Sequence, residues 1–238
     1  MRHITCLILL LMALVIPIAA QDSTPTATAD TDLCFNKGGI IGEETGRCQL
    51  NMSVNISYDY PLELIDYPFI VDEVDDYYET ARTSFLQMAV ESGFAPSPVY
   101  IWESDLSYDI SLMSDSLVSV IFYNYQFTGG AHGLTSMTAM TFDLSTETLL
   151  SLADLFPDGV VPYEAISDYS ATVLEERLGA DATFPEGYTP DPANYQIWTL
   201  SEEGLIIYFS QYQVAPYVAG IQQVVIPFDE IGVSEAYR

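Results

Sequence analysis

The chain has 238 residues, and its 34 acidic residues outnumber its six Lys and Arg so strongly that the formal net charge at pH 7 is −28. This charge argues against nucleic acids and anionic membranes as partners and favours cationic proteins or divalent cations, unless it reflects only solubility or habitat. Hydrophobic residues make up 49% of the chain, which is enough for a packed core and favours one domain, or two at most.

Residues 1–20 have the features of a secretory signal peptide. Arg2 supplies a positive charge, residues 4–16 are apolar, and Ala19 and Ala20 offer a small-residue cleavage site. The apolar run is shorter than the roughly 18–20 residues that span a bilayer, which favours cleavage over a retained membrane anchor. A secreted or periplasmic protein is therefore expected, with no membrane attachment after cleavage.

A Ser-, Thr- and Pro-rich stretch at 21–33 is expected to be a flexible linker, and residues 34–238 a single domain. Cys34 and Cys48 are the cysteines that remain after signal cleavage. In an exported protein a disulfide is the expected state, and closing a loop of this size contributes about 3 kcal/mol. A metal or redox pair is the alternative, but no CxxC motif or Cys/His cluster accompanies these cysteines.

Two alternating segments flank a helical one in the next part of the chain. Residues 49–60 and 99–112 alternate apolar and polar side chains and are predicted to be strands. Residues 72–91 carry apolar side chains at helical spacing and are predicted to form a helix. Acids crowd residues 72–76, where a helix start favours negative charge; a cation site is the alternative.

The second of these strands is predicted to present an acidic face. Glu103, Asp105 and Asp109 lie on one side of it, opposite a face of apolar side chains. Three carboxylates on one side of a sheet are a candidate docking surface for a cationic partner. A face that is only solvated is the favoured interpretation of this pattern.

The stretch 117–156 organises the rest of the chain. Residues 117–127 are apolar on both faces, which is typical of a central, buried strand. The tetrad Gly-Gly-Ala-His at 129–132, followed by Gly133, allows a tight connection with positive φ. A long hairpin is predicted, and its turn carries His132, the one histidine that remains after signal cleavage.

The last third of the chain predicts a helix, a hairpin and a final strand. The helix is expected to begin near Pro162 and to end at Gly179. The remaining segments are a proline-rich loop at 181–194, a hairpin with strands at 195–200 and 205–210, an irregular stretch at 212–220 and a strand at 222–226. The element order predicts an α+β fold, with a mainly antiparallel β-sheet and two helices packed on it.

Three stretches carry a family resemblance: YQFTGGAHG at 125–133, TFDLSTETLLSLADLF at 141–156 and YFSQYQVAPYVAGIQQVVIPFDEI at 208–231. They resemble the RsiV-like extracytoplasmic domain, a domain of unknown function shared by anti-sigma factors and the N-terminal part of PdaC-type peptidoglycan deacetylases. The similarity covers nearly all of the chain after the linker. It implies an exported binding domain of the cell envelope.

The resemblance suggests two ligands. RsiV-like domains bind lysozyme, a strongly basic protein that an acidic surface would attract. The fusion to a deacetylase makes peptidoglycan, or another carbohydrate, the second candidate. Anti-sigma activity is not expected, because only three residues precede the apolar signal region. Deacetylase chemistry is not expected either, because it belongs to a separate domain.

His132 is the candidate for a catalytic role. As a general base it would need a nucleophile and an orienting acid, for which Thr128, Ser136 and Asp143 are the nearest candidates. The chain has no GxSxG or HExxH motif and no second histidine for a zinc site after signal cleavage. A turn histidine bonded to the backbone is favoured over a cell-wall hydrolase or esterase, and no catalytic residue, metal or cofactor is expected.

Tyrosines near the C-terminus complete the candidate site. Tyr208, Tyr212 and Tyr217 are candidates for a ligand platform, but core packing, with the hydroxyls reaching the rim, is favoured. The full set of candidate binding residues is Gly129, Gly130, His132, Gly133, Tyr212, Tyr217, Glu103, Asp105 and Asp109.

Overall fold

The computed structural model describes residues 40–49, 54–92 and 101–238. The predicted signal peptide, the linker and Cys34 lie outside these residues. Cys48 is disulfide-bonded, and its predicted pairing with Cys34 stays a prediction. No helix in the described part of the chain is long and apolar enough to cross a membrane.

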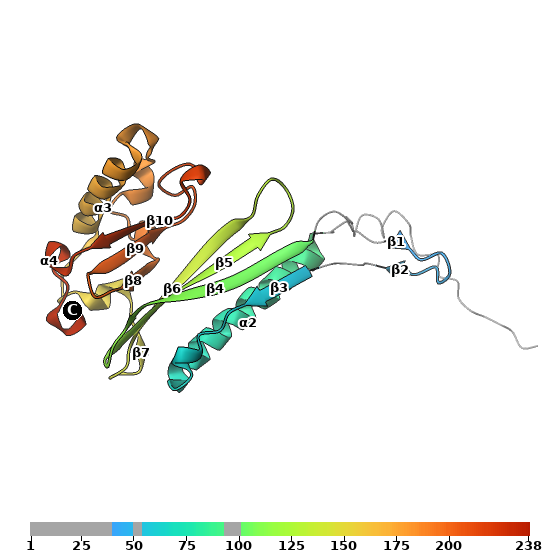
Figure 1. Ribbon diagram of the computed structural model, residues 1–238, viewed down its shortest axis with the longest axis horizontal. Coiled ribbons are helices and arrows are strands. Elements are labelled where there is room, and N and C mark those ends of the chain that lie inside the picture. Colours follow the sequence, from blue (N-terminus) through green and yellow to red (C-terminus); the bar gives the residue numbers. More distant parts are fainter. Residues whose placement is uncertain (1–39, 50–53, 93–100) are drawn as a thin grey trace, which may run out of the picture.

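The fold is α+β and mostly antiparallel, as predicted, but its main strands fall into two sheets (Figure 1). The larger sheet has the order β3-β4-β5-β6-β7, and the smaller one the order β10-β9-β8. A short pair of strands, β1 (Ile40–Ile41) and β2 (Cys48–Gln49), precedes them. The strands of the larger sheet are β3 (Val54–Tyr58), β4 (Trp102–Met113), β5 (Leu117–Phe127), β6 (Leu134–Asp143) and β7 (Thr148–Leu149).

β3 and β4 run parallel, whereas the other pairs in the larger sheet are antiparallel. The connection between them is helix α2 (Pro68–Glu91), which supplies the long crossover that a parallel pair requires. The helix begins four residues before the predicted start, because Pro68 suits its first position. The acids at 72–76 therefore lie beyond the first turn, which holds no acidic residue, and the expectation that they match the helix start is wrong.

β5 is the central strand, as predicted. Val120 and Phe122 are fully buried against α2, and Ile121 is fully buried on the opposite face, toward the smaller sheet. The Ser119 hydroxyl on that face accepts a hydrogen bond from the Leu200 N–H at 2.8 Å. The larger sheet is thus covered on one face by α2 and on the other by the smaller sheet.

The second long helix, α3 (Tyr163–Leu178), packs on the smaller sheet and was predicted. The short helix α4 (Phe228–Ile231) was not predicted. The strands of the smaller sheet are β8 (Trp198–Leu200), β9 (Leu205–Phe209) and β10 (Gln222–Ile226). The predicted loop at 181–194 contains 3-10 turns. The 3-10 helices are η1 (Leu62–Leu64), η2 (Leu152–Leu155), η3 (Ala180–Ala182), η4 (Pro185–Tyr188), η5 (Pro192–Tyr195), η6 (Tyr217–Ala219) and η7 (Glu235–Tyr237).

Candidate functional site

The turn between β5 and β6 has the backbone that its glycines require. Gly129 and Gly130 have φ angles of 97° and 100°, which residues other than glycine rarely adopt. Gly133 is needed for another reason: a Cβ atom at this position would lie 2.4 Å from the Tyr125 ring. Three glycines therefore shape the turn and allow the Tyr125 ring to lie directly against it.

His132 is exposed at this turn and bonds to the backbone, as the sequence analysis favoured. Its Nδ1 lies 2.9 Å from the Gly133 carbonyl oxygen, so Nδ1–H is the donor and Nε2 is left as an acceptor. The Tyr217 hydroxyl donates to the same carbonyl at 3.0 Å. The imidazole stacks on the Tyr217 ring, with centroids 3.9 Å apart and planes inclined by 23°.

Tyr212 extends this stack. Its ring centroid lies 5.4 Å from that of Tyr217, its backbone has a φ of 69°, and its side chain is 52% exposed. The Gln211 side chain holds the same loop against β6, because its Oε1 accepts the Thr135 N–H at 3.1 Å. His132, Tyr217 and Tyr212 form an aromatic row that joins segments far apart in the sequence. Such a row can stack on a sugar ring or on an organic cation.

The acidic residues of β4 lie on the same face of the larger sheet. Glu103 and Asp105 are exposed, and their cross-strand neighbours on β5 are Phe127 and Tyr125. Asp105 is oriented by the Ser57 hydroxyl, which donates to it at 2.7 Å. The structure therefore brings together the two surfaces that the sequence analysis treated separately.

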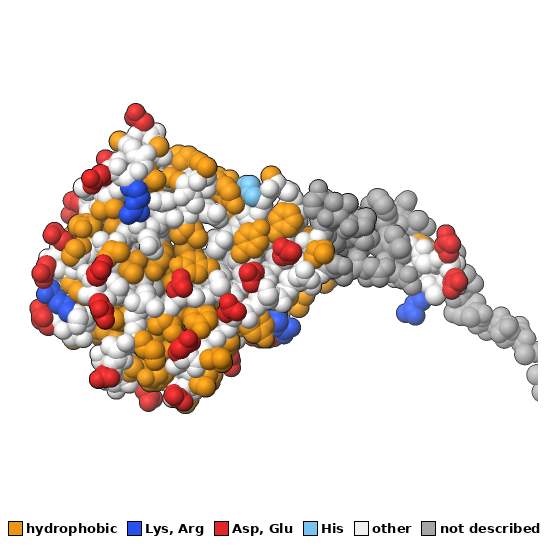
Figure 2. Space-filling model, in the orientation of Figure 1, with side chains coloured by type: hydrophobic (Ala, Val, Ile, Leu, Met, Phe, Trp, Pro, Cys, Tyr) orange, Lys and Arg blue, Asp and Glu red, His pale blue; other side chains and the backbone are white. Residues whose placement is uncertain are grey.

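We call this surface the acid–aromatic face. It consists of the aromatic row, Tyr125, and the carboxylates Glu103, Asp105 and Asp109. Figure 2 shows the histidine at the upper rim of a surface on which acidic side chains alternate with hydrophobic ones.

Two tyrosines lie beneath this face, the half-buried Tyr123 and the buried Tyr208. Burial raises the pKa of Tyr123 to about 12, and the nearby Tyr208 and Asp109 add to the effect. Burial likewise raises the pKa of Tyr208, to which Asp109 also contributes. Both hydroxyls stay protonated at neutral pH, and the negative charge of Asp109 contributes to the raised pKa of each tyrosine.

Two of the three candidate catalytic partners of His132, Asp143 and Ser136, make hydrogen bonds to other residues. Asp143 lies at the far end of β6, about 30 Å along the strand, and accepts hydrogen bonds from Ser145. The Ser136 hydroxyl faces the Asn124 carbonyl oxygen at 3.5 Å. The hypothesis that Asp143 orients His132 is therefore wrong. Within the described ranges, no group of three or more His, Cys, Asp or Glu is arranged to hold a metal ion.

Two features of the site were not foreseen from the sequence. The stacking of His132 on Tyr217 was missed, although the motifs that carry both residues were recognised as parts of one domain. A groove lined by Tyr58, Tyr60 and Tyr108 at the edge of β3 was also missed. The alternation of residues 49–60 placed Tyr58 on the apolar face of a strand that was expected to run to residue 60, whereas β3 ends at Tyr58.

Comparisons with known families match most of the folded region. The description "Deacetylase PdaC" matches residues 49–135, and "Protein of unknown function (DUF3298)" matches residues 153–229. A solved DUF3298 family protein from Pseudomonas aeruginosa shares the fold, with a TM-score of 0.54 and 24% identity, over 84% of this chain and 91% of that one.

Two curated relatives carry functional names. Esterase Rv3036c of Mycobacterium tuberculosis is 26% identical over 187 residues, which cover 76% of this chain and 82% of the esterase. The peptidoglycan-N-acetylmuramic acid deacetylase PdaC of Bacillus subtilis is 28% identical over 127 residues. That match covers 52% of this chain but only 27% of the deacetylase.

Proposed function

Because this chain belongs to the DUF3298/PdaC-like domain family, we propose that it is an exported, non-catalytic binding domain of the cell envelope. Its ligand is a cationic protein of the lysozyme type, and the acid–aromatic face is the contact surface. The observation that carries the proposal is the joining of exposed carboxylates and a stacked aromatic row on one face. Each part suits one property of a basic protein surface.

The carboxylates supply attraction at a distance. A formal net charge of −28 steers a basic partner toward the molecule, and Glu103 and Asp105 lie exposed at the proposed contact. Electrostatic attraction of this kind raises the association rate but weakens as salt is added. Charge alone therefore does not define a specific complex.

The aromatic row supplies the short-range part of the contact. Tyr212 is half exposed, and its ring adjoins Tyr217, which is itself held by the bond to Gly133. Tyrosines that are already fixed lose little conformational entropy on binding, and they accept both alkyl groups and cations. This contact should survive salt concentrations that screen the charges.

The test is a calorimetric titration of the protein with a c-type lysozyme, at low salt and near 0.5 M salt. The Debye length falls to roughly 4 Å near 0.5 M, so binding that persists there requires a shaped interface. We expect persistent binding that Tyr212→Ala weakens by about tenfold, the scale of an interface tyrosine. Glu164→Gln, on α3, is the control and should bind as the unaltered protein does.

Two results would remove the proposal. Binding at low salt alone would show generic attraction between opposite charges. No binding at either salt concentration would move the proposal to peptidoglycan fragments, for which the same aromatic row would stack on sugar rings.

A second candidate function is ester hydrolysis that uses His132. It is favoured by the M. tuberculosis relative named as an esterase and by the free Nε2 of an exposed imidazole. Hydrolysis of p-nitrophenyl acetate by the protein and by His132→Ala tests it. Turnover that disappears in a folded His132→Ala protein would support an esterase, whereas equal background rates would remove it.

A further inference from the structure

A groove opens where β3 separates from β4. The parallel pairing runs from Val54–Trp102 to Tyr58–Leu106, and the chain then turns away into η1. A cavity of about 570 Å³ lies at this point, and a second of about 310 Å³ continues it toward α2. Tyr58 and Tyr60 line both cavities, so the two adjoin each other.

We call the two adjoining cavities together the tyrosine groove. Four tyrosines line it: Tyr58, Tyr60, Tyr78 and Tyr108. The Tyr78 ring lies edge to face with Tyr58, at a centroid distance of 5.4 Å, and is tilted against Tyr60, at 5.5 Å. The Tyr60 hydroxyl donates to Asp75 at 2.8 Å, the Tyr108 hydroxyl donates to Glu63 at 2.9 Å, and the Tyr78 hydroxyl donates to the Asp59 carbonyl. Because three of the four hydroxyls are engaged, the rings are fixed before any ligand arrives.

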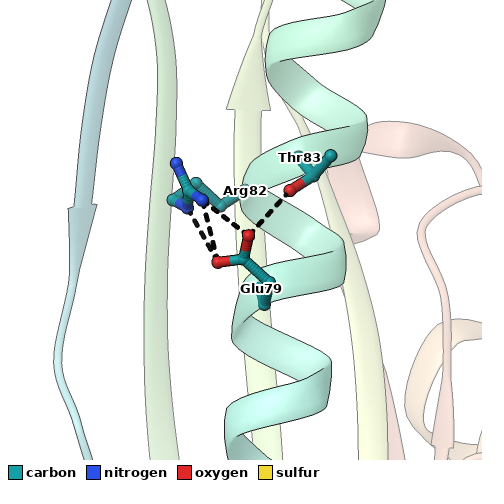
Figure 3. Close-up of polar contacts among 3 residues, drawn as sticks. All are labelled: Glu79, Arg82 and Thr83. Carbon is teal, nitrogen blue, oxygen red and sulfur yellow. Dashed lines mark hydrogen bonds and ion pairs between the residues drawn. The ribbon is translucent and has the colours of Figure 1, made fainter.

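The groove is strongly negative. Its acidic lining residues are Asp59, Glu63, Asp75, Glu79 and Asp109, and its one cationic lining residue is Arg82. Glu79 neutralises that cation, because the Arg82 guanidinium binds both Glu79 carboxylate oxygens, at 2.6 and 3.1 Å (Figure 3). The other four carboxylates form no ion pair within the described residues, although Asp75 and Glu63 accept the tyrosine hydroxyls.

Hydrogen bonds between carboxylates and tyrosines shift pKa values in this groove. A bond to its own backbone N–H, followed by the bond from Tyr108, lowers the pKa of Glu63. Burial and the bond to Asp75 raise the pKa of Tyr60 to about 12. At neutral pH the groove therefore presents negative charges and aromatic rings together.

An apolar rim adds a third property. Leu62 lines the groove with 67% of its surface exposed, and Ile110 lies on the β4 side. Lysine and arginine have the matching chemistry: an apolar stem packs on such a rim, while the charged head reaches aromatic rings and carboxylates. A bare divalent ion would use only the carboxylates.

We propose that the tyrosine groove docks a lysine or arginine side chain from a basic peptide segment of a protein partner. The inference rests on the proposed function, because it names a second contact for the same class of partner. The surface is different, however: no member of the aromatic row lines the groove, and Asp109 alone belongs to both.

The experiment is a calorimetric titration with an acetylated and amidated Gly-Arg-Gly-Arg-Gly peptide. The control peptide has citrulline in place of arginine, which keeps the shape and removes the charge. We expect the arginine peptide to bind and the citrulline peptide not to bind. Tyr58→Ala should weaken binding about three- to tenfold, and Tyr58→Phe, which keeps the ring, should weaken it less than twofold.

A second pair of variants removes one charge at two places. Glu63→Gln can still accept the Tyr108 hydroxyl, so it tests the charge without removing the bond, and a several-fold weakening is expected. Glu202→Gln, in the turn between β8 and β9, removes the same charge far from the groove and should bind as the unaltered protein does. This pair keeps the test decisive if Tyr58→Ala fails to fold.

The inference is overturned if the citrulline peptide binds equally, if Tyr58→Ala and Glu63→Gln bind normally, or if Glu202→Gln weakens binding as much as Glu63→Gln. It is also overturned if millimolar calcium displaces the peptide completely, because the groove would then be a cation site. If lysozyme still binds through Tyr212 in any of these cases, the proposed function stands without the groove. If neither lysozyme nor peptide binds, both fall.

Discussion

The two tyrosine-rich surfaces of this molecule are built in opposite ways. The aromatic row joins the β5–β6 turn to a loop of the smaller sheet, and His132 and Tyr217 bond to one backbone carbonyl. The tyrosine groove is built from α2, β4 and the segment that runs from β3 into η1, and Tyr60 and Tyr108 donate to carboxylates. The row therefore depends on how the two sheets pack, whereas the groove depends on how α2 packs on the larger sheet and on bonds from tyrosines to carboxylates.

The largest expected effect tests the core beneath the groove. Phe122 is fully buried, and its ring lies 5.8 Å from that of Tyr78 and 5.1 Å from that of Tyr77. Phe122→Ala should lower the free energy of unfolding by about 3–5 kcal/mol, because it removes a large side chain from a packed core. Urea unfolding measures it, and a loss below about 1 kcal/mol would contradict the packing described.

The next effect separates the row from the groove. Gly133→Ala places a methyl group against the Tyr125 ring, so we expect a loss of about 1–3 kcal/mol in thermal unfolding. The stack of His132 on Tyr217 should be disturbed, and lysozyme binding should weaken while arginine-peptide binding persists. Ala131→Ser, at an exposed position in the same turn, is the matched control and should change stability by less than about 0.5 kcal/mol.

A smaller change isolates one hydrogen bond in the row. Tyr217→Phe removes the hydroxyl that donates to Gly133 but keeps the ring against His132. A typical hydrogen bond contributes about 0.5–1.5 kcal/mol, and we expect a loss in this range by chemical denaturation. An equal loss of stability in Tyr212→Ala, whose ring is half exposed, would show that the bond is not the cause.

The smallest effect is a pH dependence that belongs to the groove. The pKa of Tyr60 is raised from 10.0 to about 12 in the folded protein, so its contribution to stability is complete below pH 10 and is lost as pH rises toward 12. Tyr60→Phe should flatten this part of the stability curve. Thermal melts across the alkaline range measure it, and identical curves for both proteins would contradict the assignment.

Local patterns were sufficient for most of the elements. Alternation located β4, an apolar run on both faces predicted β5 as a central strand, and the glycines of the β5–β6 turn indicated positive φ. These features depend on neighbours in sequence, and periodicity reports them directly. The start of α2 at Pro68 was missed because the periodic apolar positions alone set the predicted boundary.

The candidate site needed information that local patterns do not hold. Nothing in the sequence around His132 indicates that Tyr217 stacks on it, because that contact depends on the smaller sheet crossing β5 at Ser119 and Leu200. The division into two sheets and the parallel pairing of β3 with β4 are likewise tertiary choices. The acidic residues of β4 were placed on one face correctly, but which aromatic residues share that face was not.

The most direct test of the central claim is lysozyme binding near 0.5 M salt, measured by calorimetry for the protein and for Tyr212→Ala. We expect the protein to bind at this salt concentration and the variant to bind about tenfold more weakly, because the aromatic row rather than net charge holds the complex. Equal binding by both proteins, or binding by neither, would contradict the assignment of the acid–aromatic face as the contact surface.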